Sequence, residues 1–200
     1  MPTVRSQLLE VVRDAYPETF QGLSPSEPLG ESMFSGQAPH PNEVLNLFVQ
    51  QKFESVLPMA YYMAARKGPD SLMGSQLPRN ATLSPDVLQS AIRGLMTLRE
   101  MELGEIHFLA FDLKGCTDGG CPSGVGDPSV HQNVFDHIVG PSQRGTRVLQ
   151  VPEFYEDCGG RFVRVFPDMC NHCAEMWERG HADLRRKAWA TLSDAFGLKG

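Results

Sequence analysis

The feature that most constrains this 200-residue chain is a run of helical periodicity from Ser84 to about Leu113. Ser84 suits a helix-capping position, Pro85 suits the first turn, and Asp86 suits the positive end of the helix dipole. Leucine and isoleucine then recur at helical spacing as far as Leu113. At about 1.5 Å per residue, a helix of this length spans roughly 40 Å. The sequence therefore predicts one long helix as the central packing element of the fold.

The predicted helix has a broad apolar face. We expect Ile92, Leu95 and Leu109 to be buried, because residues three and four positions apart share one side of a helix. Gly94 and Gly104 are its only internal glycines, and they allow a bend or a close contact with another helix. The apolar face comprises Leu88, Ile92, Leu95, Leu103, Ile106, Leu109 and Leu113.

Shorter helices are predicted around this one from the same periodicity. The sequence contains no set of strands large enough for a sheet. The stretches 21–40 and 114–127 are rich in Gly and Pro, which is typical of flexible loops. The expected class is mainly α: an irregular stack of about five to seven helices in a single domain, residues 1–200. The shorter helices are expected at about 4–16, 41–53, 55–67, 127–140 and 167–196, the last with a break at Gly180.

Composition indicates the cellular compartment and argues against two classes of partner. No apolar run approaches the ~18 residues that a membrane-spanning helix needs, and the N-terminal segment lacks the apolar core of a secretory signal. Five cysteines without such a signal indicate a reducing compartment, so we expect the cytoplasm or the nucleus. The formal net charge of −6 argues against a general nucleic-acid binder.

One cluster of basic residues stands out against the acidic balance of the chain. It comprises Arg185, Arg186 and Lys187, with Arg179 and His181 just before them. Cations near the C-terminal end of a helix suit the helix dipole, so a solvated helix face explains the cluster. A nuclear-targeting patch has the same composition and remains the alternative.

Two pairs of cysteines form the candidate chemical site. Cys116 and Cys121 bracket the turn TDGG, and Cys170 and Cys173 lie three positions apart in MCNHCAEMW. Four thiolates are a ligand set typical of structural zinc, so these four cysteines are the candidate metal ligands. The favoured interpretation of the second pair is instead a buried helix face on which Cys173 and Trp177 pack as apolar residues, and the zinc site is the alternative. A redox pair would need a strand before the helix, within a βαβ unit, and the sequence lacks that context.

No assembled catalytic motif is present in the sequence. The histidines do not lie beside a serine or cysteine in a nucleophile motif, and there is no phosphate-binding loop and no HExxH. Glu100, Glu102 and Glu105 cluster on the long helix, where we expect a solvated face. The chain is therefore expected to be non-enzymatic, and a structural zinc ion is its only candidate cofactor.

Four stretches of the sequence occur in an order known from one protein family. They are RSQLLEVVRDAYPETF, NEVLNLFVQQKFESVLPMAYYMAAR, LSPDVLQSAIRGLMTLREMELGEIHFLAF and RRKAWATLSDAFGL. In this order they resemble the helical region that follows the BTB/POZ domain in a large group of fungal BTB-domain proteins. The mixed sheet of the BTB domain itself is missing, so self-association and cullin-ligase recruitment are not implied. We expect a shortened relative or an incomplete gene model.

The resemblance implies a non-enzymatic protein-interaction module. Such a module presents the surface of a helical stack to another protein, whose identity the sequence does not give. Neither a membrane nor a nucleic acid is expected as a partner. The alternative function is a small zinc-stabilised protein associated with nucleic acid or chromatin, with the cluster Arg185–Lys187 as its contact.

Overall fold

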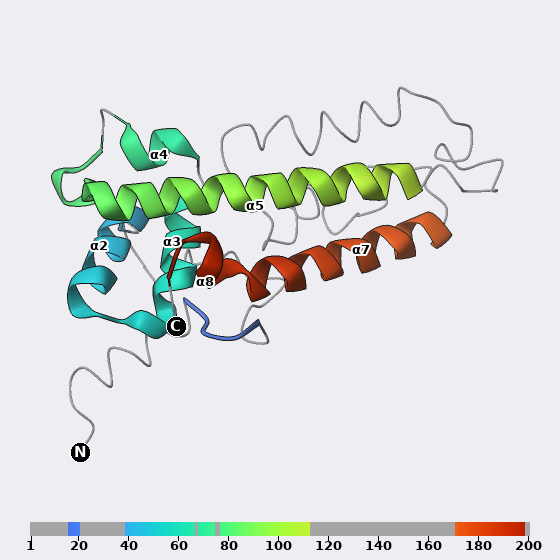
Figure 1. The fold of residues 1–200 in the computed structure, drawn as a ribbon, viewed down its shortest axis with the longest axis horizontal. Helices are drawn as coiled ribbons and strands as arrows, with labels where there is room; N and C mark the ends of the chain where they lie inside the picture. The colour runs from blue at the N-terminus through green and yellow to red at the C-terminus, as the bar shows by residue number, and fades with distance from the viewer. Residues whose placement is uncertain (1–15, 21–38, 67, 75–76, 113–170, 199–200) are drawn as a thin grey trace, which may run out of the picture. The chain divides into compact units, whose positions relative to one another are not determined.

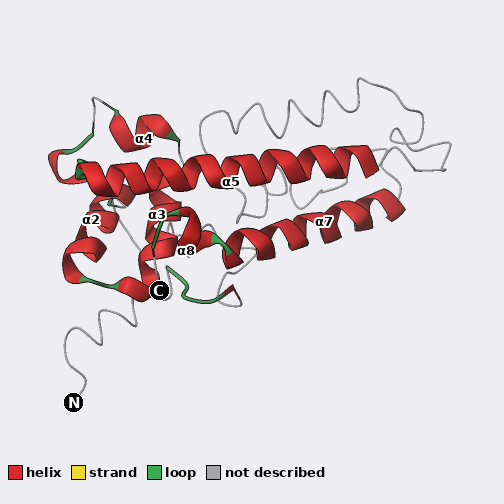
Figure 2. Ribbon diagram, viewed as in Figure 1, coloured by secondary structure: helices red, strands yellow, loops and turns green. Residues whose placement is uncertain are grey.

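The computed structural model of the chain describes residues 16–20, 39–66, 68–74, 77–112 and 171–198. Within these ranges the chain forms six α-helices and no strand (Figure 2). The mainly α class expected from the sequence is therefore confirmed. The chain divides into two compact units, one formed by Met1–Thr97 with Trp189–Gly200 and the other by Leu98–Ala188.

The helices expected from the sequence are present wherever the structure describes them. The expected helices 4–16 and 127–140, and the expected loop 114–127, lie outside the described residues, as does most of the loop 21–40. The final helical region breaks at Thr191, whereas Gly180 lies inside a continuous helix. The elements are α2 (Pro41–Gln51), η2 (Glu54–Val56), α3 (Leu57–Ala65), α4 (Pro69–Met73), η3 (Arg79–Ala81), α5 (Pro85–Asp112), α7 (Asn171–Ala190) and α8 (Leu192–Ala195) (Figure 1).

Helix α3 forms the centre of the first unit. All seven consecutive residues from Met59 to Ala65 are buried, so this helix is surrounded by protein on every side. A helix that is apolar all round is stable only in such a position. The central packing role that the sequence predicts for the long helix α5 stays a prediction. On its solvent side α5 exposes a stripe that includes Asp86, Arg93 and Met96.

Helix α5 begins where the sequence predicts. The Leu88 amide donates to the Ser84 carbonyl at 2.8 Å, which is the first bond of the helix. With 28 residues, α5 is the longest helix in the described part of the chain. Leu95 is buried as expected, whereas Ile92 is only half-buried. The side chain of Leu109 lies outside the described residues.

The buried stripe of α5 is rotated by one residue from the predicted face. It runs through residues four and three positions apart: Val87, Ala91, Gly94 with Leu95, and Leu98. The predicted face was based on the large aliphatic residues, so it left out the small ones. Small residues line this stripe because another side chain, that of Phe196, approaches the helix backbone closely.

Two asparagines of α2 hold the segment before α5 in place. Asn42 is fully buried, and its amide nitrogen donates to the Ser71 carbonyl at 2.9 Å and to the Ala81 carbonyl at 3.1 Å. One turn later, the Asn46 amide nitrogen donates to the carbonyls of Asn80 and Thr82, both at 2.9 Å. Side chains thus satisfy backbone carbonyls that belong to no regular ladder.

The ends of α2 and α8 are closed by local hydrogen bonds. At the start of α2, His40 Nδ1 accepts from the Asn42 amide at 3.2 Å, and Glu43 accepts from the His40 amide at 3.3 Å. At the end of α8, Gly197 adopts φ +70°, and the Leu198 amide donates to the Ser193 carbonyl at 2.9 Å. This second arrangement is a Schellman motif, for which glycine is the favoured residue.

The second unit contains the last part of α5 and most of α7. Its described buried side chains are Leu98 and Glu102 on α5, and Leu184 and Ala188 on α7. On each helix the two residues are four positions apart, so each pair lies on one face. These two faces supply the described core of this unit.

Candidate functional site

The structure describes little of the predicted metal site. Cys116, Cys121 and Cys170 lie outside the described residues. Cys173 lies in the first turn of α7, but its side chain is also outside the described part. Among the described residues no group of three or more His, Cys, Asp or Glu side chains is arranged to hold a metal ion. The structural zinc site stays a prediction.

The acidic cluster on α5 is not one solvated face. Glu100 is exposed as expected, but Glu102 is buried, with 7% of its surface accessible. The expectation of a solvated face is wrong for Glu102 because it follows the buried Leu98 by one helical turn. Glu102 is engaged in an interaction within the fold. The side chain of Glu105 lies outside the described residues.

The basic cluster on α7 belongs to a helix surface of mixed charge. Arg179, Arg186 and Lys187 are exposed, and Arg186 forms an ion pair with Asp183 one turn earlier. Helix α7 contains four arginines and lysines and three acidic residues, so its net charge is only +1. A nucleic-acid contact would need a stronger basic excess, so this observation favours the solvated helix face.

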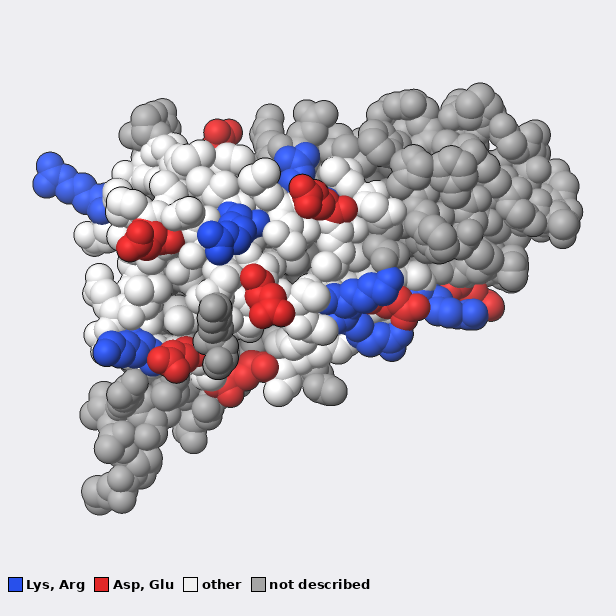
Figure 3. All heavy atoms as spheres, viewed as in Figure 1, with Lys and Arg blue, Asp and Glu red and all other residues white. Residues whose placement is uncertain are grey.

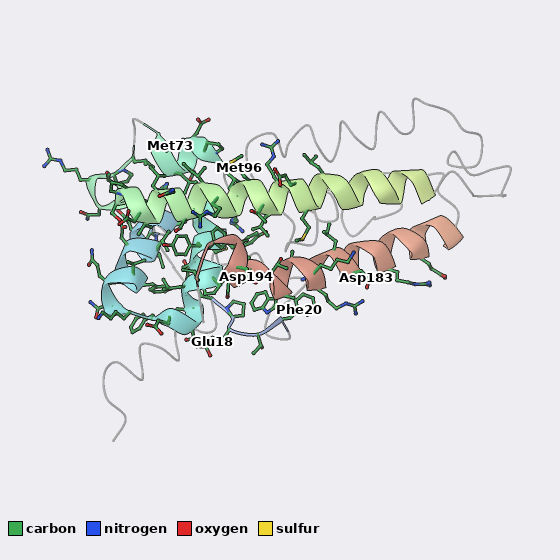
Figure 4. All side chains as sticks on the ribbon, viewed as in Figure 1. Glu18, Phe20, Met73, Met96, Asp183 and Asp194 are labelled. Atoms are coloured by element: carbon green, nitrogen blue, oxygen red, sulfur yellow. The ribbon has the colours of Figure 1, made fainter. Side chains whose placement is uncertain are left out.

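Large apolar side chains that are exposed in the described part of the chain offer a different candidate. Met96 is 59% exposed, Met73 is 53% exposed and Leu47 is 45% exposed. Met96 lies on the exposed stripe of α5, and Met73 is the last residue of α4. Both belong to the first unit, and Figure 4 labels Met73 at α4 and Met96 at α5. We call Met73 and Met96 the methionine surface.

Each residue of the methionine surface is held by buried neighbours. Leu72 is buried beside Met73, and Leu95 is buried beside Met96. The backbone is thus anchored from below while the thioether side chain faces solvent. Methionine is unbranched and polarizable, so it adapts to the shape of a partner. The phase of the α5 stripe would have identified Met96, since Arg93 and Glu100 flank it at helical spacing on the exposed side.

Charges of both signs lie near Met96 on the exposed side of α5. On the face shown in Figure 3, Lys and Arg atoms alternate with Asp and Glu atoms, and neither sign gathers into one large patch. On α5, Met96 is three residues after Arg93 and four before Glu100. An apolar centre with a polar rim is typical of a protein–protein interface.

Two buried tyrosines have raised pKa values for a structural reason. Burial raises the pKa of Tyr16 to about 12, although the nearby Arg66 charge opposes the shift. Burial also raises the pKa of Tyr61, while a hydrogen bond between the Tyr61 and Ser90 side chains acts in the opposite direction. Both hydroxyls therefore stay protonated at neutral pH. A tyrosine held in this state does not serve as a general base.

The comparisons with known proteins do not assign a family. Neither the protein-family models, nor the curated proteins, nor the solved structures contain a match to this chain. The resemblance to the region after the fungal BTB domain therefore stays a prediction. Within the described residues, no helix has both the length and the apolar character needed to cross a membrane.

Proposed function

We propose that the chain is a helical, non-enzymatic protein-interaction module. The observation that supports it is the methionine surface: two large apolar side chains more than half exposed on helices whose neighbouring residues are buried. Covering such side chains removes apolar area from water, which favours association by about 25 cal/mol per Å² before the entropic cost of binding. The resemblance to the region after the BTB domain implies the same kind of function.

The partner is proposed to be another protein. Arg93 and Glu100, the exposed residues of opposite charge on either side of Met96 along α5, favour a polar rim that matches a protein rather than a polyanion. The five cysteines favour a reducing compartment, the cytoplasm or the nucleus, as the place of this contact.

The test uses the full chain as bait in an extract of cells that express it. The double variant Met73→Lys/Met96→Lys places two charges on the methionine surface, and Leu47→Lys is the matched control on α2, outside that surface. We expect at least one retained protein to fall about tenfold or more with the double variant, which corresponds to roughly 1.4 kcal/mol of binding. The control is expected to retain that protein.

Quantitative mass spectrometry of the retained proteins decides the result. Far-UV circular dichroism checks that both variants keep the helical content of the wild type. If every retained protein binds the double variant and the wild type equally, the methionine surface is not the contact. Substrate turnover by the purified chain, abolished by a single side-chain change, would exclude the non-enzymatic function.

A further inference from the structure

The first unit contains a socket that is shaped for one phenylalanine. Phe196 is completely buried, and its ring stacks on Tyr61 with centroids 5.2 Å apart and planes 26° apart. A Cβ atom placed on Gly94 would overlap the Phe196 ring, so only glycine leaves room there. We call Tyr61 and Gly94 the socket, and Leu192–Leu198 the Phe196 segment.

The Phe196 segment presents its apolar residues on one side. Leu192 and Ala195 are buried together with Phe196, whereas Ser193 and Asp194 are exposed. The Schellman motif at Gly197 fixes the turn directly after the ring. Figure 1 shows the result, with α8 lying against α3. The segment is therefore a short preformed wedge rather than an extended tail.

The segment and its socket are distant in the sequence. Residues 98–188, a stretch of 91 residues, separate the two parts of the first unit. The segment joins α7 through a single turn residue, Thr191, with φ −101° and ψ 2°. We expect a change of the backbone angles near Thr191 to direct the segment away from its own socket.

We propose that the socket also accepts the Phe196 segment of a second copy of this chain, which produces a segment-swapped dimer. The contacts in the swapped form are the same as those within one chain: Phe196 on Tyr61 and over Gly94. Exchange of an identical element between copies needs no new complementary surface. The partner is thus a second copy, and the proposal does not depend on the methionine surface.

Competition within one chain sets the concentration at which the dimer forms. A tethered segment acts at an effective concentration of roughly millimolar, so the closed single chain dominates in dilute solution. If a chain's own Phe196 segment cannot fill its own socket, the swapped dimer forms at a lower concentration. Two variants together create this condition: one has an intact socket without the phenylalanine, and the other has the phenylalanine without an open socket.

The experiment mixes the full-length variants Phe196→Ala and Gly94→Ala in equal amounts. Phe196→Ala keeps the socket, and Gly94→Ala keeps the phenylalanine but blocks its own socket. At about 50 µM, far below the millimolar effective concentration of a tethered segment, light scattering after gel filtration is expected to show a species of twice the 22.1 kDa chain mass. Each variant alone is expected to remain a single chain.

The control mixes Phe196→Ala with the double variant Gly94→Ala/Phe196→Ala. Neither chain then carries Phe196, so no dimer is expected. Met73 and Met96 are unchanged throughout, so a dimer held by the methionine surface would also appear in this control. A complementary mixture that contains only single chains overturns the proposal, provided that circular dichroism shows both variants to be folded.

Wild-type chain provides the second measurement if either variant fails to fold. Refolding from urea at about millimolar concentration, where exchange competes with internal closure, is expected to give a dimer that persists on dilution until it is unfolded. A wild-type chain that stays single after this treatment overturns the proposal as well.

Discussion

Gly94 and Gly104 lie ten positions apart on the same helix, but their surroundings differ. The ring of Phe196 fills the space beside Gly94, whereas no described atom lies within 4 Å of a Cβ placed on Gly104. We expect Gly94→Ala to lower the free energy of unfolding by about 3–5 kcal/mol, because the added methyl group displaces the buried Phe196 ring. Gly104→Ala is expected to raise it by about 0.5–1 kcal/mol, because alanine favours the helix. Urea denaturation of both variants measures the difference, and shifts of the same sign would contradict it.

Asn42 is the buried residue whose replacement we expect to be most harmful. Asn42→Asp keeps the shape of the side chain but replaces its NH2 donor with an oxygen. This oxygen cannot donate to the two carbonyls that Asn42 now binds. Each buried carbonyl left without a donor costs about 1–3 kcal/mol, so a loss in the range of ~2–5 kcal/mol is expected. Asn46→Asp is the matched control, because its bonds are exposed to water. Thermal unfolding that ranks Asn46→Asp as the more damaging change would refute this assignment.

Tyr16 makes the stability of the fold sensitive to alkaline pH. Its pKa is raised by burial to about 12, whereas an unfolded tyrosine loses its proton near 10. Its contribution is therefore complete below pH 10 and is lost as the pH rises through 12. Between these values the free energy of unfolding is expected to fall by about 1.4 kcal/mol per pH unit from this group. Tyr16→Phe should show a shallower fall in urea titrations, and an unchanged slope would exclude Tyr16 as the cause.

At the scale of the elements, α2 and α8 end in the same motif with different residues. The last turn of α2 closes through the Phe53 amide and the Phe48 carbonyl at 3.0 Å, with Lys52 in the left-handed region at φ 53°. The rings of Phe48 and Phe53 also contact, with centroids 5.8 Å apart. This hydrophobic contact across the helix end accompanies a Schellman motif.

Substitutions at the two helix ends are expected to have opposite effects. Lys52→Gly removes the strain of a left-handed lysine and should raise the free energy of unfolding by about 0.5–1 kcal/mol. Gly197→Ala should lower it by about 1–2 kcal/mol, since its Cβ would be strained and would approach the Arg93 side chain at 2.9 Å. Differential scanning calorimetry measures both. A stabilising Gly197→Ala would mean that the turn after α8 is not fixed in solution.

How well the sequence predicted each element depended on the kind of signal. The start of α5 follows from Ser84 and Pro85, because capping is a local property. The predicted buried face of α5 differs from the observed one by one residue. The observed face includes the small residues Ala91 and Gly94, and Gly94 is buried there by the ring of a residue that is distant in the sequence. Nothing near Gly94 in the sequence points to Phe196.

The candidate site shows the same division between local and distant information. Exposure of Met96 follows from local helical spacing, because the charged residues Arg93 and Glu100 lie on the same side of α5. Burial of Glu102 was missed because a carboxylate in the core requires partners that only the tertiary structure supplies. The cysteine pairs are separated by about fifty residues, so their convergence on zinc stays a prediction from composition.

For the whole molecule, Phe196 is the residue on which closure of the first unit depends most. It contacts Tyr61, which precedes it by 135 positions. We expect Phe196→Ala to lower the free energy of unfolding by about 3–5 kcal/mol, the range for removal of a buried aromatic side chain. Truncation of the exposed Leu47 to alanine is the control and should change stability by less than about 1 kcal/mol. Chemical denaturation that gives similar losses for both would show that the socket contributes little.

The placement of residues 192–198 in the first unit also has a consequence for synthesis. Ribosomes add about 5–20 residues per second, so the 91 residues between the two parts of this unit occupy roughly 5–20 s. Throughout that interval Tyr61 and Gly94 of the nascent chain are not covered by the Phe196 ring, because Phe196 has not yet been added. During translation, this apolar site is available to chaperones before the chain's own phenylalanine can reach it.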